Sequence, residues 1–451
     1  MKTYQTNQIK NIALLGNTGS GKTLLAESML FEGKVIERKG TIEGKNTVSD
    51  YTEIEQQNMR SIFSTILYTE FKDNKLNIID TPGSDDFVGA VITSLRAADI
   101  GVMTINSQYG VEVGTEIFNR YAEHMHKPLI FAITQLDSEK ANYDQTIESL
   151  KQSFGNKVIQ IQYPVSTGTG FDTFIDVLLM KMYKFSGDTG QREELDIPAS
   201  ELEKANELHN ALVEAAAEND ESLMEKYFEQ GSLTEDEMRR GIRVGLSNRS
   251  LFPVFCTSAK KNIGTKRLME FIINVAPDPS RVPLLPTVEE KEVKCDANAP
   301  TSIFVFKTSI ESHIGEINYF KVMSGKVTEG MEITTNSQKA RKAREMVMNL
   351  ILATHPKDCL TCDRSADCEL RTLADKMGVR KIDFGAPVKD LPLDDSNPSI
   401  IRDSSKCILC RRCVSVCNEV QNVSAIGMIN RGIGTTVGTA FDRGLADSPC
   451  V

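Results

Sequence analysis

Eight consecutive residues near the start of the chain have the types and spacing that can hold a phosphate group. Their sequence, GNTGSGKT, fits the pattern G-x-x-x-x-G-K-[ST]. Glycines in such a loop let backbone N–H groups turn toward a phosphate, the lysine reaches its outer oxygens, and the final hydroxyl ligates Mg²⁺. The loop therefore predicts a nucleotide-binding protein. The candidate phosphate-binding residues are Gly16, Asn17, Thr18, Gly19, Ser20, Gly21, Lys22 and Thr23.

A second motif supplies groups for a metal ion and for a terminal phosphate. A predicted strand over residues 76–79 ends in the sequence DTPG, which contains Asp80 and Gly83. An Asp at the carboxyl end of a strand beside a phosphate loop can hold Mg²⁺ through water, and a glycine N–H can meet a γ-phosphate. We therefore expect Thr23 and Asp80 to organise Mg²⁺, and Gly83 to face the γ-phosphate.

A third group of residues is suited to recognising a base. The predicted strand over residues 128–133 ends in the sequence TQLD, whose last residue is Asp137. A carboxylate there can accept both the N1–H and the N2 amine of guanine, and such a buried acceptor can reject the wrong base by about 10⁴-fold in favourable cases. The loop after the predicted strand at 254–256 could place the backbone of Ser258 and Ala259 against guanine O6. The candidate base-binding residues are Thr134, Gln135, Asp137, Ser258 and Ala259.

Cysteines give the other end of the chain a different chemistry, because eight of the ten lie at or beyond residue 359. One set could close a tetrahedral zinc site or hold an iron–sulfur cluster. It consists of His355, Cys359, Cys362 and Cys368. The next set has the C-x₂-C-x₂-C-x₃-C spacing of bacterial ferredoxins, which favours iron–sulfur over zinc. It consists of Cys407, Cys410, Cys413 and Cys417.

The elements that must position the nucleotide-binding residues alternate between apolar strands and helical segments. Further strands are predicted at 12–15 and 100–105, and a helix follows the phosphate loop. This alternation predicts an α/β fold with a doubly wound sheet and the ligand at the carboxyl ends of the strands.

The formal net charge of −10 argues against a general nucleic-acid binder. No run of 18 apolar residues and no signal peptide is evident, which predicts a cytoplasmic protein with no membrane partner.

Residues 8–336 resemble the translational GTPases, and elongation factor G most closely. An acidic helical segment at 201–248 resembles the extra subdomain that this factor carries inside its GTP-binding domain, and we interpret it as a solvated helical pair. The resemblance implies GTP and GDP as ligands, with Lys22 as a catalytic cation. It also implies the ribosome as a partner, without sequence-specific contacts to nucleic acid.

The chain departs from the family pattern at three places. Ser84 stands where the family has the His that positions the attacking water, so it takes the candidate catalytic position and predicts slow hydrolysis. Gln135 replaces the Lys that packs over the base. Ser61 aligns with the Thr of the family's R-G-I-T sequence and is a candidate hydroxyl ligand for Mg²⁺.

Beyond a charged, Pro-rich linker, alternating stretches at 302–307, 319–323 and 330–333 are separated by glycines. They predict antiparallel strands and resemble the start of the family's second domain, a small β-barrel. About half of the strands of such a barrel are expected.

Residues 335–451 resemble the iron–sulfur region of iron-only hydrogenases and of the large NADH dehydrogenase subunit. The resemblance implies a [4Fe–4S] cluster on the set that begins with His355. A two-cluster ferredoxin domain follows in those proteins, where Cys450 would be a ligand of the second cluster. Because the sequence ends at Val451, we expect both ferredoxin clusters to be incomplete.

The expected domains are a GTP-binding domain at 1–285 with a helical insert at about 190–250, then a linker and partial barrel at 286–337. The two iron–sulfur parts follow at 338–400 and 401–451. The favoured function is a slow GTPase of elongation factor G type joined to a [4Fe–4S] fragment. One alternative is an electron-transfer protein with its own redox partner, and another is a chimeric chain whose halves share no function.

Overall fold

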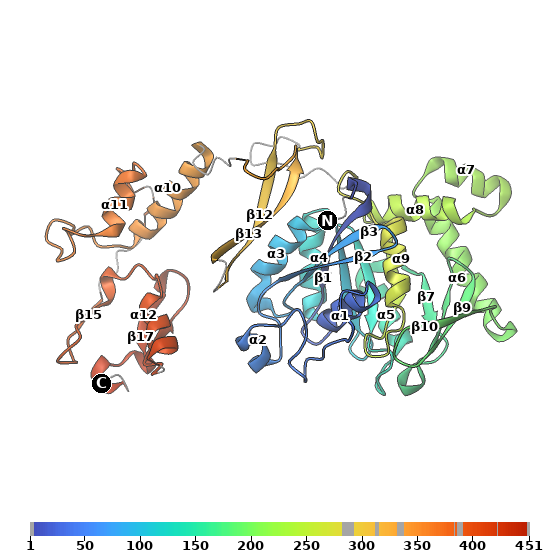
Figure 1. The fold of residues 1–451 in the computed structure, drawn as a ribbon, viewed down its shortest axis with the longest axis horizontal. Coiled ribbons are helices and arrows are strands. Elements are labelled where there is room, and N and C mark those ends of the chain that lie inside the picture. The colour runs from blue at the N-terminus through green and yellow to red at the C-terminus, as the bar shows by residue number, and fades with distance from the viewer. Residues whose placement is uncertain are drawn as a thin grey trace. The chain divides into compact units, whose positions relative to one another are not determined.

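The computed structural model describes residues 4–281, 293–311, 315–331, 338–382, 384–385, 391–421 and 423–448. It divides into two compact units, Met1–Thr328 and Glu329–Val451. Figure 1 shows the course of the chain through each unit.

A seven-stranded sheet forms the centre of the first unit, in the order β2-β3-β1-β4-β5-β11-β6. All neighbouring strands are parallel except β2 and β3. Strands β4 and β5 are buried along their whole length, as expected for parallel strands covered on both faces. The α/β doubly wound fold predicted from the sequence is therefore confirmed. The strands are β1 Ile9–Leu15, β2 Thr65–Phe71, β3 Asn74–Asp80, β4 Ile100–Asn106, β5 Leu129–Thr134, β6 Val158–Gln160 and β11 Phe252–Cys256.

Two pairs of helices pack on this sheet, α1 with α9 and α3 with α4 (Figure 1). The helix predicted after the phosphate loop is α1, which starts directly at Lys22. Gly21 precedes it with φ 89°, a left-handed conformation that glycine adopts without a steric penalty. The helices around the sheet are α1 Lys22–Glu32, α2 Glu53–Asn58, α3 Val88–Ala97, α4 Val113–His124, α5 Tyr143–Phe154 and α9 Thr265–Val275.

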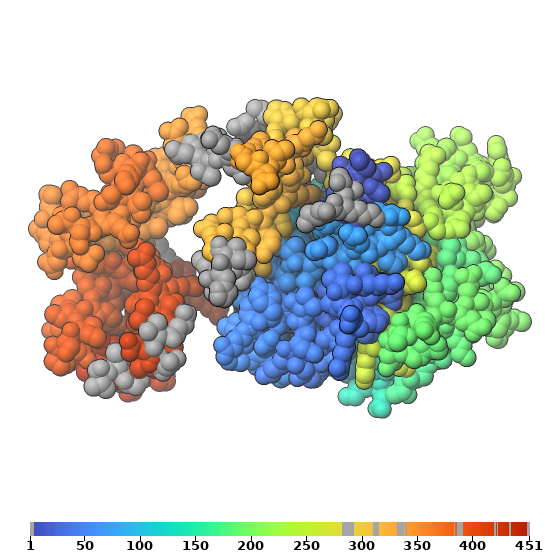
Figure 2. Space-filling model, viewed as in Figure 1, coloured from blue at the N-terminus to red at the C-terminus, as the bar shows by residue number. Residues whose placement is uncertain are grey.

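An insert with a second sheet lies between β6 and β11 in the sequence. Its helices α6 Ala199–Ala217, α7 Glu221–Gln230 and α8 Glu235–Ser247 make three helices where the sequence predicted a pair. They are the light green lobe of Figure 2. The buried ion pair between Arg267 and Asp176, at 2.7 Å, fixes this sheet to α9. The strands are β7 Gln162–Pro164, β8 Thr173–Asp176, β9 Lys181–Ser186 and β10 Gln191–Leu195.

A two-stranded hairpin stands where the partial barrel was predicted. Strands β12 (Ser302–Glu311) and β13 (Gly315–Ser324) pair antiparallel. Lys321 on β13 forms an ion pair with the buried Asp99, next to β4. The third predicted strand, at 330–333, lies partly outside the described residues.

The second unit is built from short elements. Its longest helix is α10, which has 16 residues. No helix in the described parts of the chain is long and apolar enough to cross a membrane. The elements are α10 Gln338–Ala353, α11 Glu369–Lys376, α12 Arg412–Ser415, β14 Leu393–Asp394, β15 Arg402–Asp403, β16 Ile426–Ile429 and β17 Thr436–Thr439.

Candidate functional site

The phosphate loop wraps around the ammonium group of Lys22. Its Nζ donates to the carbonyl oxygens of Gly16, at 2.8 Å, and Asn17, at 2.9 Å. Burial lowers the pKa of Lys22 to about 8, against the opposing effect of the nearby carboxylates, chiefly Asp80. The buried ammonium group forms its hydrogen bonds with neutral carbonyl oxygens. It can therefore bind a phosphate, whose negative charge would compensate its own positive charge.

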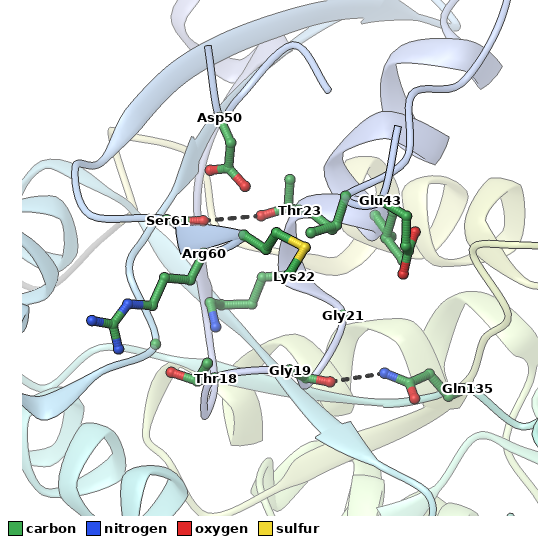
Figure 3. A pocket seen from close by; sticks show the side chains of 14 residues that line it. Thr18, Gly19, Gly21, Lys22, Thr23, Glu43, Asp50, Arg60, Ser61 and Gln135 are labelled. Carbon is green, nitrogen blue, oxygen red and sulfur yellow. Dashed lines mark hydrogen bonds between the residues drawn. The ribbon is translucent and has the colours of Figure 1, made fainter. Parts of the chain in front are cut away.

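A cavity of about 280 Å³ opens beside this loop. Figure 3 shows side chains from four segments around it: the loop, the residues near Glu43, the residues from Asp50 to Ser61, and Gln135. Gly83 also lines it, and a Cβ there would lie 2.6 Å from the backbone nitrogen of Thr18 and 2.5 Å from Lys22 Nζ. Position 83 therefore has to be glycine for the DTPG turn to approach the loop this closely.

Hydroxyl and carboxylate oxygens gather on one side of the cavity. Asp80 Oδ2 accepts hydrogen bonds from the hydroxyls of Thr23 and Ser49, both at 2.7 Å. The Thr23 hydroxyl also lies 3.2 Å from that of Ser61 (Figure 3). Thr23, Ser61 and Asp80, predicted as metal-binding residues, thus lie together in the structure.

Asp50 joins this group, and its part was not predicted from the sequence. Burial raises the pKa of Asp50 to about 6, while a hydrogen bond from Ser61 lowers it. The Oδ1 atoms of Asp50 and of Asp80 are both buried without a hydrogen-bond partner in the described structure. Two orphaned carboxylate oxygens beside two hydroxyls are the hard oxygen ligands that Mg²⁺ prefers, so the residues present fit this ion.

Two buried glutamates hold the segment that carries Asp50 and Ser61. Glu27 on α1 accepts the N–H groups of Gly40, at 2.7 Å, and Val48, at 2.6 Å. Glu55 accepts the N–H groups of Ile62 and Phe63, both at 3.0 Å, just beyond Ser61. The segment is therefore fixed on both sides of the oxygen cluster.

Ser84 stands apart from this cavity. Its hydroxyl lies 3.4 Å from the carboxylate of the exposed Asp86, and it is not among the residues that line the cavity. Arg60, by contrast, is exposed and lines the cavity (Figure 3). Arg60 was not predicted from the sequence as a site residue, although a cation next to the predicted ligand Ser61 was a signal for it.

Thr134 and Gln135 connect the base-binding motif to the phosphate loop. Thr134 Oγ1 donates to the carbonyl oxygen of Ser20 at 2.6 Å, and Gln135 Nε2 donates to that of Gly19 at 2.8 Å (Figure 3). Asn106 at the end of β4 donates to Gln135 Oε1 at 3.3 Å. Gln135 therefore lies across the edge of the loop as a neutral, hydrogen-bonded amide.

Asp137 and the loop after β11 follow neighbouring parallel strands, because β5 and β11 pair in register. Asp137 is half-buried, and among the described residues none donates a hydrogen bond to its carboxylate. The Ser258 backbone pairs with Ile263 in both directions, at 3.0 and 2.9 Å. Ser258, Ala259 and Asp137 are not among the residues that line the cavity beside Thr23, Asp50 and Ser61.

The first cysteine set surrounds a cavity between α10 and α11. His355, Cys359 and Cys368 line it, whereas Cys362 does not. The Cys368 sulfur accepts the Arg371 N–H at 3.5 Å, a contact typical of sulfur at the start of a helix. Within the described parts of the chain, no three His, Cys, Asp or Glu side chains meet closely enough to hold a metal ion. One histidine and three cysteines are suitable ligands for an iron–sulfur cluster, and three of the four line one cavity. Their sulfur atoms, however, do not converge on one point.

The second cysteine set lies next to the first. Lys406 pairs with Asp358 at 3.5 Å, and Arg412 pairs with Glu369 at 3.6 Å, so two ion pairs link residues adjacent to the two sets. The sulfurs of Cys407 and Cys417 each accept a backbone N–H, from Leu409 and Ala425. Cys410 and Cys413 are exposed, and Cys450 lies outside the described residues.

Three family models match this chain. Residues 7–278 match the elongation factor Tu GTP binding domain. Residues 344–383 match the NADH-ubiquinone oxidoreductase-G iron-sulfur binding region. Residues 397–449 match the ferredoxin-like domain of NADH-quinone oxidoreductase subunit 3.

Two individual proteins are similar to the part of the chain that the first family model matches. An elongation factor G-like protein of Thermotoga maritima is 31% identical over 335 residues, which cover 73% of this chain and 47% of that protein. A crystal structure from Thermus thermophilus is similar with a TM-score of 0.65 and 28% identity, covering 72% of this chain and 47% of that one. The chain thus spans about half the length of these two proteins.

Proposed function

The chain belongs to the family of the elongation factor Tu GTP binding domain and joins it to [4Fe–4S] binding regions, and from this premise we propose that its first unit is a slow GTPase. The proposal rests mainly on the group of oxygens formed by Thr23, Asp50, Ser61 and Asp80 beside the phosphate loop. These residues offer a Mg²⁺ site at the place where the outer phosphates of a nucleotide would lie.

In the proposed site, each side chain has a distinct task. Lys22 and the loop amides hold the β- and γ-phosphates, and Arg60, which lines the same cavity, adds positive charge. Thr23 and Ser61 offer hydroxyls to Mg²⁺, and Asp50 and Asp80 hold the ion through water. When bound, Mg²⁺ neutralises charge on the phosphate oxygens. Asp137 selects guanine at the other end of the nucleotide.

We expect Mg²⁺-dependent binding of GDP and GTP in clear preference to ADP. Fluorescently labelled GDP and ADP, titrated into the full chain with and without Mg²⁺, measure this directly. Because Gln135 offers a neutral amide, the affinity is expected to be lower than with a complete N-K-x-D sequence. Equal affinity for the two bases would contradict the proposed function.

Hydrolysis by the isolated protein is expected to be on the order of 10⁻⁴ s⁻¹, the rate of unassisted GTPases. The reason is that the Ser84 hydroxyl donates to Asp86, and that a serine cannot orient the attacking water as the imidazole of a histidine would. The variant Ser84→His is therefore expected to raise the single-turnover rate by at least about tenfold, whereas Ser84→Ala leaves it unchanged. A wild-type rate near 1 s⁻¹, or a loss of rate in Ser84→Ala, would show that Ser84 already takes part in the reaction.

The ribosome is the proposed partner of the first unit, by analogy with the elongation factor G-like relative. For the second unit we propose electron transfer with a redox partner. Two exposed ion pairs join residues next to the two cysteine sets, so the sets lie near one another, as electron transfer between clusters would require. We also propose a GTP-binding domain at 1–285, a linker and partial barrel at 286–337, and two iron–sulfur parts at 338–400 and 401–451.

A further inference from the structure

Lys39 makes a connection that the proposed nucleotide site does not yet explain. Its ammonium group donates to the carbonyl oxygens of Ala259, at 2.6 Å, and Lys260, at 3.0 Å. Lys39 is half-buried and belongs to the segment between α1 and α2, whereas Ala259 and Lys260 belong to the loop after β11. A single side chain thus joins two segments that are more than 200 residues apart in the sequence.

The bonds of Lys39 fix the direction of a peptide plane. The Ala259 carbonyl also accepts the hydroxyl of Ser28, at 3.1 Å, and the N–H of Asn262, at 3.3 Å. In a trans peptide the carbonyl and the following N–H point in opposite directions. Three donors on the Ala259 carbonyl therefore turn the Lys260 N–H the other way, away from Lys39.

The preceding peptide is fixed in a similar manner. The Ser258 carbonyl accepts the Ile263 N–H at 2.9 Å, so the Ala259 N–H points away from that bond. In the described structure neither the Ala259 N–H nor the Lys260 N–H donates a hydrogen bond. Two adjacent N–H groups with set directions are thus left available beside the strand that leads to Asp137.

The surroundings of Lys39 are acidic. Burial lowers its pKa, and the charges of Asp188, Glu32 and Asp137 act in the opposite direction. Asp137 is the carboxylate expected to face the guanine N1–H and N2 amine. The ammonium group is therefore close enough to the base-binding carboxylate to interact with it electrostatically.

Lys39 is also linked to the metal-binding side of the site. The next residue, Gly40, donates its N–H to Glu27, which also accepts the Val48 N–H. Ser49 follows and donates to Asp80 at 2.7 Å. A short series of bonds therefore runs from the loop after β11 to the oxygens expected to bind Mg²⁺.

We propose that Lys39 is a positioning residue for base recognition, which orients the Ala259 and Lys260 N–H groups toward the O6 atom of a guanine or hypoxanthine base. This inference rests on the proposed function, because it assigns a role within the same guanine-nucleotide site. Lys39 acts through the loop and does not itself touch the base.

The test compares three diphosphates that differ in the polar groups of the purine. GDP carries O6, the N1–H and the N2 amine, IDP carries O6 and the N1–H, and purine riboside diphosphate carries none of the three. Binding of each is measured in Mg²⁺ to the full chain, to Lys39→Ala and Lys39→Arg, and to Arg38→Ala as a matched control on an exposed neighbouring cation. The affinity for purine riboside diphosphate also reports whether each variant is folded.

Lys39→Ala is expected to weaken GDP and IDP by about tenfold each, which corresponds to one hydrogen bond of about 1.4 kcal/mol. Purine riboside diphosphate should bind unchanged, so the GDP to IDP ratio stays constant. Lys39→Arg should recover most of the loss, because a guanidinium can donate to the same two carbonyls, and Arg38→Ala should match the wild type.

Two results would overturn the inference while leaving the proposed function intact. One is an equal loss of affinity for all three ligands in Lys39→Ala, which would mean that the substitution affects the whole site and not the recognition of the base. The other is no loss for any of them. If the wild-type protein itself does not prefer GDP to ADP, the proposed function fails first, so the two failures can be told apart.

Discussion

Replacing Asp137 by Asn is expected to move the base preference from guanine to xanthine nucleotides. The carboxylate of Asp137 can accept two donors from guanine, whereas an asparagine amide presents one acceptor and one donor. Xanthine carries a carbonyl where guanine carries the N2 amine, so it pairs with the amide and not with the carboxylate. Because a mismatched buried polar group costs several kcal/mol, the ratio of GDP to XDP affinity should fall by about 10⁴-fold in a favourable case.

Competition titrations with GDP, XDP and ADP measure this change. The neighbouring variant Asp144→Asn on α5 is a suitable control, since it makes the same chemical substitution in the first turn of a helix without facing the base. A variant Asp137→Asn that loses GDP but gains nothing for XDP would indicate a structural role. Such a result would remove Asp137 from the base-binding site.

Replacing Cys368 by Ala is expected to abolish the cluster held by the first cysteine set. Cys368 shares one cavity with His355 and Cys359, and its sulfur is oriented by the Arg371 N–H. A [4Fe–4S] cluster that loses a cysteine thiolate is left with an iron open to solvent, which makes it labile. After anaerobic reconstitution, the variant should lose about four irons per chain and the matching visible absorbance.

Cys295→Ser provides the control, because Cys295 is an exposed cysteine of the first unit. It should leave the iron content unchanged. GDP affinity, measured on the same samples, should be equal in all three proteins, because the cluster ligands belong to a separate compact unit. A GDP affinity that follows iron content would instead reveal a joint function for the two halves.

The central sheet and the phosphate loop could be predicted from the sequence because their signals are local. Strands β4 and β5 are continuous apolar runs, and the loop between β1 and α1 has a fixed spacing of glycines. Strand β2 was not predicted: it lies at the edge of the sheet, and two of its four buried positions are threonines, which interrupt the apolar pattern. Helix α2 was not predicted either, because its six residues are too few to show a helical period.

Asp50 shows why part of the site could not be predicted. Nothing in its own neighbourhood distinguishes it from the other acidic residues of the chain. Its environment comes from Ser61, eleven positions later, and from Asp80 at the end of β3. Such a role depends on the folded path of the segment, which the two glutamates Glu27 and Glu55 determine through backbone N–H groups.

The two bonds of Glu27 also make a small, tied loop of residues 40–48. Because both ends of this loop are anchored, a substitution at its tip leaves the length of the loop, and therefore the entropy cost of closing it, unchanged. Lys45 is exposed at the tip, while Ile42 and Glu43 of the same loop line the phosphate cavity. A fluorescent amino acid introduced at position 45 would therefore report nucleotide binding optically and leave the proposed Mg²⁺-binding oxygens unchanged.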